Sequence, residues 1–480
     1  MSRNRDRLIR LDDGERILSR QQVEAIAERV FRLAQGGGET RVRVESWWQG
    51  ELRWGRNRVS LASDRRDVSL SVIRGQPFGA DGAASTNQFD DVSVEAAVRA
   101  AERALARQDQ PPKAEFLPQL PKLELPQSSI WSDATYNLTA EARGEIARSL
   151  VDSAEQKGML SAGYTEVRAA SYAELSSEIR AGKPARFETP YAAWTQAQCS
   201  MTVRDPKGTG SGWAGLSSYD WAKIDSSALA ERALDKCIRS RNPVSLEPGR
   251  YTVILEPQAV ADLTEPLIWK LDRIRTEQGD GPFVLAGDDA LGLVRTKLGL
   301  KVVDERITLS HDYADPALGI VPRVGMGTGP ISWIDHGVLT AMFYGRTYAL
   351  RQLGDNYGVR DPTGYRMSGG TATPDEMIRS TKRGLLVTRF SNVSILDQNS
   401  VLCTGLTRDG LWLIENGKIT KPVKNFRFTE SPLFVLNNIE QLGPPMRVFR
   451  PTGPAGQLTP AIVPAIMARD FSFTSLVDAV

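Results

Sequence analysis

The chain has 480 residues, which is more than one ordinary hydrophobic core accommodates and predicts two or three domains. Its 41% hydrophobic and 25% charged residues are typical of a globular protein and exclude a fibrous or disordered one. The net charge of +2 gives no indication of a nucleic-acid or anionic-membrane partner.

Neither the start of the chain nor its cysteines indicate export. The first residues, "MSRNRDRLIRLDDGERILSR", lack the apolar stretch of a secretory signal, and no run of about 18 apolar residues follows. Cys199, Cys237 and Cys403 are odd in number and far apart, which argues against a disulfide framework. We therefore expect a cytoplasmic protein without a membrane span.

The first half predicts helices separated by hairpin strands. Four segments have helical periodicity: 19–35, 93–108, 139–158 and about 225–240. Alternating segments lie between them, with apparent hairpin turns at 49–50 and 56–57. Because the strands come in antiparallel groups and do not alternate singly with helices, the sequence predicts an α+β fold.

A proline-rich segment and a change in composition suggest the domain boundaries. Residues 110–126 contain five prolines, which excludes a helix or a central strand and predicts an extended connector. The expected organisation is an N-terminal α+β part at 1–110, a connector at 111–126, the rest of that domain at 127–245 and a β-rich C-terminal domain at 246–480.

Two short sequence signals in the second half each predict one particular element, a hairpin turn and a short helix. Asn416 and Gly417 form the Asn-Gly pair that favours a tight β-hairpin. Ser431 as N-cap, Pro432 at the first helical position and Gly443 past the end predict a short helix over 432–442. Together with the surrounding apolar runs, these signals predict a mostly antiparallel β region.

The C-terminal strings "TKRGLLVTRF", "TGLTRDGLWLIENGKITKPVKNFRF" and "SPLFVLNNIEQLG" resemble the TldD/PmbA (TldD/TldE) family. The resemblance covers most of the chain and is most specific over 381–443. It implies a metallopeptidase system of two related subunits. In one subunit, a helix with His-Glu-x-x-x-His and a later cysteine bind zinc. The second lacks these ligands and pairs with the first around a peptide-holding cavity.

The strand "YTVILEP" and the segment after it are similar to the entry into that metal-binding helix. In the simplest alignment Thr264, Glu265 and Trp269 stand in place of His, Glu and His. A slip of one residue would place Glu265, Pro266 and Lys270 there instead. Neither register supplies a histidine, and Glu265 is a possible general base only in the first. With a helix that starts near Asp262, Pro266 falls in its first or second turn.

Other metal ligands are scarce. His311 and His336 are the two histidines, and they lie outside any close-spaced motif. Cys403 lies in the region that houses the cysteine ligand of the family, but a buried thiol in an apolar strand is the favoured interpretation. We expect neither a metal site built from these three residues nor any other cofactor in this chain.

Three further segments allow both a functional and a structural interpretation. "GTGSGW" at 208–213 lacks the ending of a phosphate loop and favours a hairpin tip. The tryptophans and arginines of 45–66 are consistent with nucleic-acid binding or with an added peptide strand, but a hairpin packed on a helix is favoured. Finally, four polar residues are candidates for the lip of a peptide cavity, or for turn chemistry alone: Arg408, Asp409, Glu415 and Asn416.

The resemblance therefore predicts a TldE/PmbA-like subunit that is itself metal-free and non-catalytic. It would form a heterodimer with a zinc-bearing TldD-like homologue and hold an extended peptide for that partner to cut. Two alternatives stay open. One is a metal-independent peptide-processing enzyme with Cys403 as nucleophile. The other is a homodimer that binds peptide or nucleic acid without cleaving it.

Overall fold

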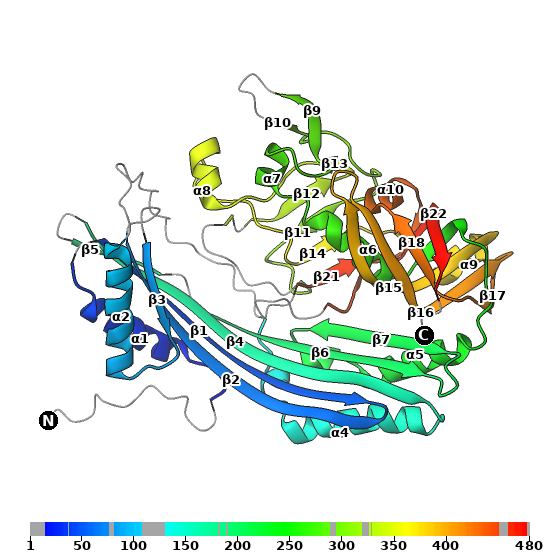
Figure 1. Ribbon diagram of the computed structural model, residues 1–480, viewed down its shortest axis with the longest axis horizontal. Helices are drawn as coiled ribbons and strands as arrows, with labels where there is room; N and C mark the ends of the chain where they lie inside the picture. The colour runs from blue at the N-terminus through cyan, green and yellow to red at the C-terminus, as the bar shows by residue number, and fades with distance from the viewer. Residues whose placement is uncertain are drawn as a thin grey trace.

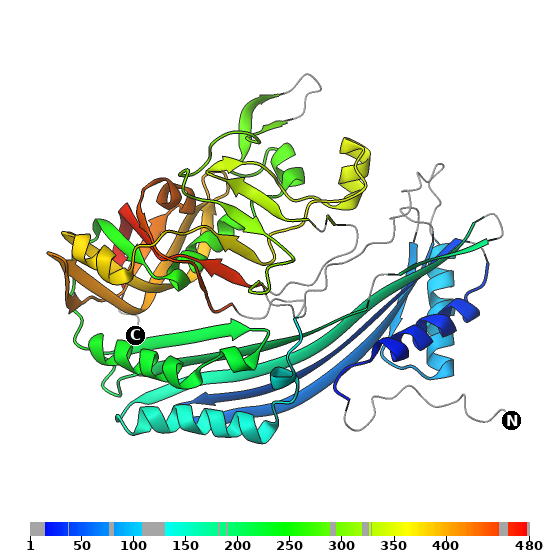
Figure 2. The same cartoon turned by 180° about the vertical axis from the view of Figure 1, so that it is seen from behind.

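The computed structural model describes residues 15–36, 38–75, 81–107, 130–180, 183–188, 191–288, 294–318, 326–327, 329–450 and 459–477. The predicted α+β class is confirmed. The first half forms a long, curved sheet with helices on its convex side, and the β-rich second half lies on the concave side of that sheet (Figures 1 and 2). Within the described ranges, every helix is too short or too polar to span a bilayer.

The N-terminal sheet is antiparallel throughout, with the strand order β3-β2-β1-β4-β6-β7 and β5 paired to β4. Its strands are β1 (Gly38–Gly55), β2 (Arg58–Gly75), β3 (Asp81–Thr86), β4 (Leu160–Arg180), β5 (Lys183–Glu188), β6 (Ala192–Arg204) and β7 (Ser211–Ser218). Strands from both sides of the proline-rich segment share this one sheet. The predicted connector at 111–126 lies outside the described residues.

All four predicted helices of this half are present. They are α1 (Arg20–Leu33), α2 (Asp91–Ala106), α4 (Ala140–Glu155) and α5 (Ser226–Arg239), beside the short α3 (Asp133–Tyr136) and η1 (Trp221–Lys223). Each long helix begins after an N-cap residue whose side chain accepts a hydrogen bond from a backbone N–H of the first turn. In chain order these N-cap residues are Ser19, Asp90, Thr139 and Asp225. The apolar face of the sheet packs on these helices in two clusters of buried side chains.

One predicted hairpin turn is confirmed and one is wrong. Arg56 and Asn57, with φ of 50° and 62°, join β1 to β2 as the sequence predicts. The supposed turn at 49–50 lies inside β1. A Cβ atom at Gly50 would collide with the guanidinium of Arg143, so this glycine makes room for a neighbouring helix and marks no turn.

The core of the C-terminal half is a small barrel. Strands β15, β8, β22, β18 and β16 pair in that order, and a further pairing of β15 with β16 closes the ring. The strands of this sheet are β8 (Gly249–Leu255), β15 (Arg383–Asp397), β16 (Leu402–Glu415), β17 (Lys418–Pro422), β18 (Phe426–Glu430), β19 (Ile439–Leu442) and β22 (Ile466–Leu476). Buried side chains on α6 (Pro257–Ile268) belong to the large apolar cluster of this half.

A second sheet has the order β13-β12-β11-β14-β21-β20, and β9 pairs with β10. Its strands are β11 (Leu309–His311), β12 (Ile331–Asp335), β13 (Val338–Leu339), β14 (Tyr365–Met367), β20 (Met446–Arg447) and β21 (Ala461–Val463), and the separate pair is β9 (Val284–Asp288) and β10 (Val294–Thr296). The short helices are α7 (Arg273–Glu277), α8 (Arg346–Tyr348), η2 (Ala349–Leu353), α9 (Pro374–Ser380) and α10 (Pro432–Asn437).

The two local signals of this half have different outcomes. Asn416 and Gly417 have φ of 51° and 78° and form the β16–β17 turn, as predicted. Ser431 caps α10 and Pro432 is its first residue, but the helix ends at Asn437. The expected extent to 442 is wrong, because Ile439–Leu442 pair with β22 as strand β19.

The contact between α5 and β7 gives a test of the fold. A Cβ atom at Gly212 would collide with the backbone of Ala233 and Cys237, so Gly212→Ala must push the helix away from the sheet. We expect a loss of about 2 kcal/mol in the free energy of unfolding, as for other overpacked sites. Gly144→Ala in α4 meets nothing within 4 Å and should gain about 0.5–1 kcal/mol from helix propensity. Urea unfolding of both variants measures this, and equal stabilities would contradict the packing.

Candidate functional site

Helix α6 follows β8 out of the barrel and carries the residues that the sequence singled out. The predicted start near Asp262 is wrong, because the helix begins at Pro257, directly after the strand. Proline is favoured at the first helical position, where no backbone N–H is needed. Pro266 consequently lies near the C-terminal end of the helix and removes the intrahelical bond to the carbonyl of Asp262.

Thr264, Glu265 and Trp269 serve three different purposes in the structure. The buried Thr264 hydroxyl donates to the carbonyl of Val260 at 2.8 Å. The Glu265 carboxylate accepts two bonds from the guanidinium of Arg450, at 2.8 and 3.1 Å. Trp269 is the C-cap residue, is 42% exposed and has an edge contact with Phe343.

This set of side chains does not fit a zinc ion. A zinc site needs three or four N, S or O ligands. Here the Thr264 hydroxyl is engaged by the helix, the indole N–H of Trp269 is only a donor, and the charge of Glu265 is matched by Arg450. Over the ranges that the structure describes, no three His, Cys, Asp or Glu side chains gather closely enough to hold a metal ion.

The two histidines and Cys403 lie apart. Cys403 is buried in β16, its Sγ is 3.3 Å from the carbonyl oxygen of Val401, and burial raises its pKa to about 11. His311 is buried, has its Nδ1 3.0 Å from the carbonyl oxygen of Gly364, and has a pKa that burial lowers to about 4. His336 is largely exposed beside Asp335 at the β12–β13 turn. Since a reactive cysteine needs a lowered pKa, the environment of Cys403 favours a structural thiol.

Asp262 adds a second carboxyl group to this helix. Its Oδ1 accepts from Gln258 at 2.9 Å and its Oδ2 accepts from the backbone N–H of Phe390 at 3.0 Å. Burial raises its pKa to about 6, against the lowering effects of these bonds and of nearby guanidinium groups. Tyr365 lies close to the same groups, and burial raises its pKa as well.

The four candidate lip residues are divided between the middle of β16 and its C-terminal end. Asp409 is buried, has a φ of 56°, and accepts from Arg389 at 2.8 Å and from the Ser211 hydroxyl. Arg408 beside it is partly exposed. At the far end Glu415 accepts from Thr420 at 3.0 Å, and Asn416 forms the turn. The structure therefore places Arg408 and Asp409 at the junction of the two halves and leaves Glu415 and Asn416 apart from it.

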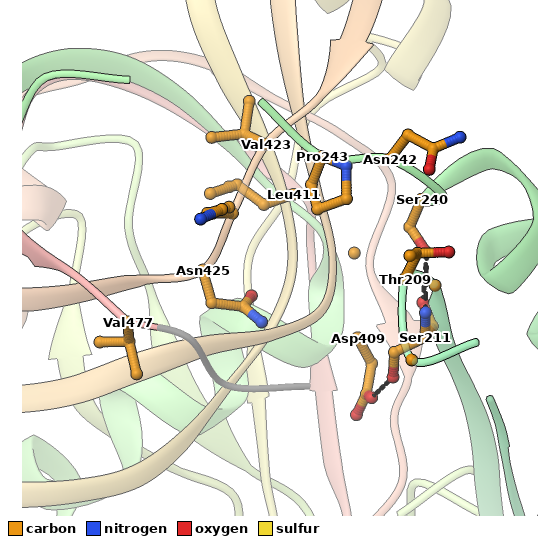
Figure 3. A pocket seen from close by; sticks show the side chains of 14 residues that line it. Thr209, Ser211, Ser240, Asn242, Pro243, Asp409, Leu411, Val423, Asn425 and Val477 are labelled. Atoms are coloured by element: carbon orange, nitrogen blue, oxygen red, sulfur yellow. Dashed lines mark hydrogen bonds between the residues drawn. The ribbon is translucent and has the colours of Figure 1, made fainter. Parts of the chain in front are cut away.

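A cavity of about 350 Å³ lies at this junction, between the β6–β7 tip and the barrel (Figure 3). Residues 208–211 line the cavity from the turn between β6 and β7 and from the first residue of β7. This placement agrees with the hairpin interpretation of "GTGSGW". Ser211 and Asp409 point toward each other in the cavity wall, and Ser240 donates to the backbone of Ser211 at 2.8 Å. These polar groups already satisfy one another.

The tryptophan-rich hairpin is mainly structural. Trp48 and Trp54 are buried in the cluster between the sheet and its helices. Trp47 points to the opposite face, where the guanidinium of Arg168 lies 4.9 Å from its ring centre. The packed-hairpin interpretation is thus confirmed for two of the three tryptophans.

The sequence did not reveal Arg450, Arg389, Asp262 or Tyr365. Arg450 is 185 residues from its partner Glu265, so no local spacing indicates the pair. Asp262 could have been found, because it lies three residues before Glu265 on the same helix.

Residues 248–475 match the family model of the PmbA/TldA metallopeptidase C-terminal domain, so this part of the chain is similar to the C-terminal domain of that family. A relative from Methanothermobacter thermautotrophicus named "Metalloprotease" is 22% identical over 250 residues, which are 49% of this chain and 52% of the relative. The matched region thus spans about half the length of that curated relative.

Three solved structures have the same fold. TldE from Thermococcus kodakarensis has a TM-score of 0.73 and 16% identity, with 94% of this chain and 99% of that chain covered. A protein from Thermotoga maritima, named as a modulator of DNA gyrase, has a TM-score of 0.72 and 14% identity, with 94% of this chain and 100% of that chain covered. One from Bacteroides thetaiotaomicron with the same kind of name has a TM-score of 0.70 and 17% identity, with 95% and 100% covered.

The raised pKa of Asp262 predicts a pH-dependent stability. Its pKa rises from 3.8 to about 6 on folding, so the folded state favours the protonated carboxyl. The resulting stabilisation is full below about pH 4 and is lost as the pH rises through 6, with an upper value of roughly 3 kcal/mol. We expect Asp262→Asn to remove this slope in urea unfolding between pH 4 and 7. The exposed Asp152→Asn on α4 is the control, and identical slopes in wild type and Asp262→Asn would contradict the assignment.

The burial of Cys403 predicts that its thiol is unreactive. The thiolate is the nucleophilic form, and a pKa of about 11 leaves little of it near pH 8. We expect iodoacetamide to leave Cys403 unmodified in the folded protein and to alkylate it fully in urea, as followed by peptide mass spectrometry. Rapid alkylation of Cys403 in the native protein would instead support the cysteine-enzyme alternative.

Proposed function

We propose that this chain is a metal-free, non-catalytic subunit of a TldD/TldE-type peptidase system. In this proposal it holds extended peptides for a homologue that carries His-Glu-x-x-x-His and zinc. The observation that carries the proposal is the pairing of Glu265 with Arg450 on α6. A general base in a metallopeptidase acts on metal-bound water, and a carboxylate held by a buried guanidinium is not available for that task.

The surroundings of α6 support a holding role over a catalytic one. Near α6, Arg450 is paired with Glu265 and Arg389 with Asp409, while burial raises the pKa of Asp262 to about 6 and favours its neutral form. Thr264 and Trp269 offer bulk and an apolar surface where the family resemblance implies histidines. The alternative of a Cys403 nucleophile has no support from its environment, since desolvation is the cause of its raised pKa.

A reconstitution experiment tests the proposal. The purified chain should contain no stoichiometric zinc by inductively coupled plasma mass spectrometry and should not hydrolyse casein-derived peptides. Mixed with a zinc-bearing TldD-like homologue, it should form a heterodimer on size exclusion and raise peptide hydrolysis at least about tenfold, since a 1.4 kcal/mol gain in substrate positioning has that effect.

The control is the same homologue with its motif glutamate replaced by glutamine, which should abolish hydrolysis in the mixture. Stoichiometric zinc or hydrolysis by the chain alone would overturn the non-catalytic role. Failure to form a complex or to stimulate the homologue would overturn the pairing and favour a stand-alone binding protein. Salt-sensitive retention on single-stranded DNA would then indicate nucleic acid as the ligand.

A further inference from the structure

The two faces of the N-terminal sheet differ in character. One face packs on the helices with apolar side chains. The other, the concave face, is directed toward the C-terminal half (Figures 1 and 2), where Phe449 has edge contacts with Tyr164 and Trp213 at centroid distances of 6.2 and 5.7 Å. Because alternate residues share a face, the even-numbered residues of β4 and β6 lie on this concave face.

On β4 and β6, three polar atoms of the concave face are buried without a hydrogen-bond partner in the described part of the chain: Nε of Arg168, Nε1 of Trp194 and Oε1 of Gln196. The atoms belong together, because Gln196 lies directly opposite Arg168 in the β4–β6 register and Trp194 is the next residue on the same face. Gln196 is 4% exposed and Trp194 is 7% exposed, whereas Arg168 is partly accessible to solvent. Unsatisfied buried polar groups oppose folding, so a ligand that supplied partners to all three atoms would gain binding free energy at this position.

Neighbouring groups on the same face are satisfied. The Tyr164 hydroxyl is 3.1 Å from Oε1 of Gln198, and the amide of Gln49 donates to Glu166 at 3.0 Å. Arg43 is paired with Glu174 at 3.1 Å. Among the described residues of β4 and β6 on this face, the unpartnered atoms are therefore confined to these three neighbouring positions.

The chemistry of the three atoms specifies the ligand. Two are N–H donors and one is a carbonyl acceptor, which matches the C=O and N–H groups of a polypeptide main chain. Arginines elsewhere on this face are paired with carboxylates, as in Arg43–Glu174 and Arg53–Glu51, so the face gives no strong attraction for phosphate. The ring of Trp47 beneath Arg168 adds an aromatic surface for side chains.

We propose that Arg168, Trp194 and Gln196 bind the main chain of an extended polypeptide on the concave face of the sheet. The site leads toward α6, because Tyr164 on the same face contacts Phe449, and the next residue, Arg450, holds Glu265. The inference rests on the proposed peptide-holding function and adds the place and the chemical groups of recognition.

Two variants and one matched control test the inference. Gln196→Met removes the unpartnered Oε1 with little change of side-chain volume, and Trp194→Phe removes the unpartnered indole N–H together with one ring. We expect Gln196→Met to keep or raise the melting temperature and Trp194→Phe to lower it because the smaller ring leaves a cavity. Both should weaken binding of reduced, carboxymethylated α-lactalbumin, a permanently unfolded chain, about 3- to 10-fold per lost hydrogen bond. Gln198→Met lies two residues along the same strand but removes a partnered group, so it should lower the melting temperature and retain the affinity.

Fluorescence anisotropy on the purified full chain, without any homologue, gives the affinities. Wild-type binding that neither Gln196→Met nor Trp194→Phe weakens overturns this inference and leaves the proposed function standing. A melting temperature of Gln196→Met that falls as far as that of Gln198→Met shows a structural partner for Gln196 and also overturns it. If the wild-type chain binds no unfolded polypeptide at all, the peptide-holding function fails and the inference falls with it.

Discussion

A buried carboxylate joins the two halves of this protein. Asp409 in the barrel accepts from Arg389 of the neighbouring strand and from Ser211 of the N-terminal sheet. The same arginine lies over the ring of Trp213, so it contacts the sheet as well. The next residue, Phe390, donates its backbone N–H to Asp262 on α6. Strand β15 therefore connects the junction of the halves to the helix, and the position of α6 above the concave face depends on this chain of contacts.

The pair of Glu265 and Arg450 gives the glutamate a role that differs from general-base catalysis. Arg450 is 5% exposed, and a buried guanidinium needs a carboxylate to offset its desolvation. Glu265 supplies that carboxylate in a two-bond geometry from the last turns of α6. The presence of Glu265 in the segment that resembles a metal-binding helix thus has a structural explanation that requires no metal.

Features that depend on neighbouring residues could be predicted from the sequence, and features that depend on residues far apart in the chain could not. The α+β class, the four N-terminal helices and the hairpins at 56–57 and 416–417 were predicted because caps, periodicity and positive-φ residues are local signals. The site was not predictable in this way. Its bonds join residues that are 128, 185 and 198 positions apart, so only the folded chain brings them together. The error at Gly50 has the same origin, because a glycine required by a tertiary contact looks like a turn residue in the sequence.

The polar side chains on the concave face indicate a role beyond packing against the C-terminal half. A sheet face that served only as a base for the C-terminal half would carry apolar side chains, as the helix-facing side does. Beside a small apolar cluster around Trp47 and Trp194, the strands present glutamine, glutamate, arginine and tyrosine on this face, and most of these polar groups bond to one another. Such a network costs stability wherever one member is left without a partner, because the interior offers no water in exchange. The three unsatisfied atoms at Arg168, Trp194 and Gln196 therefore lower the stability of the free chain, and binding of a ligand that satisfies them would recover that loss.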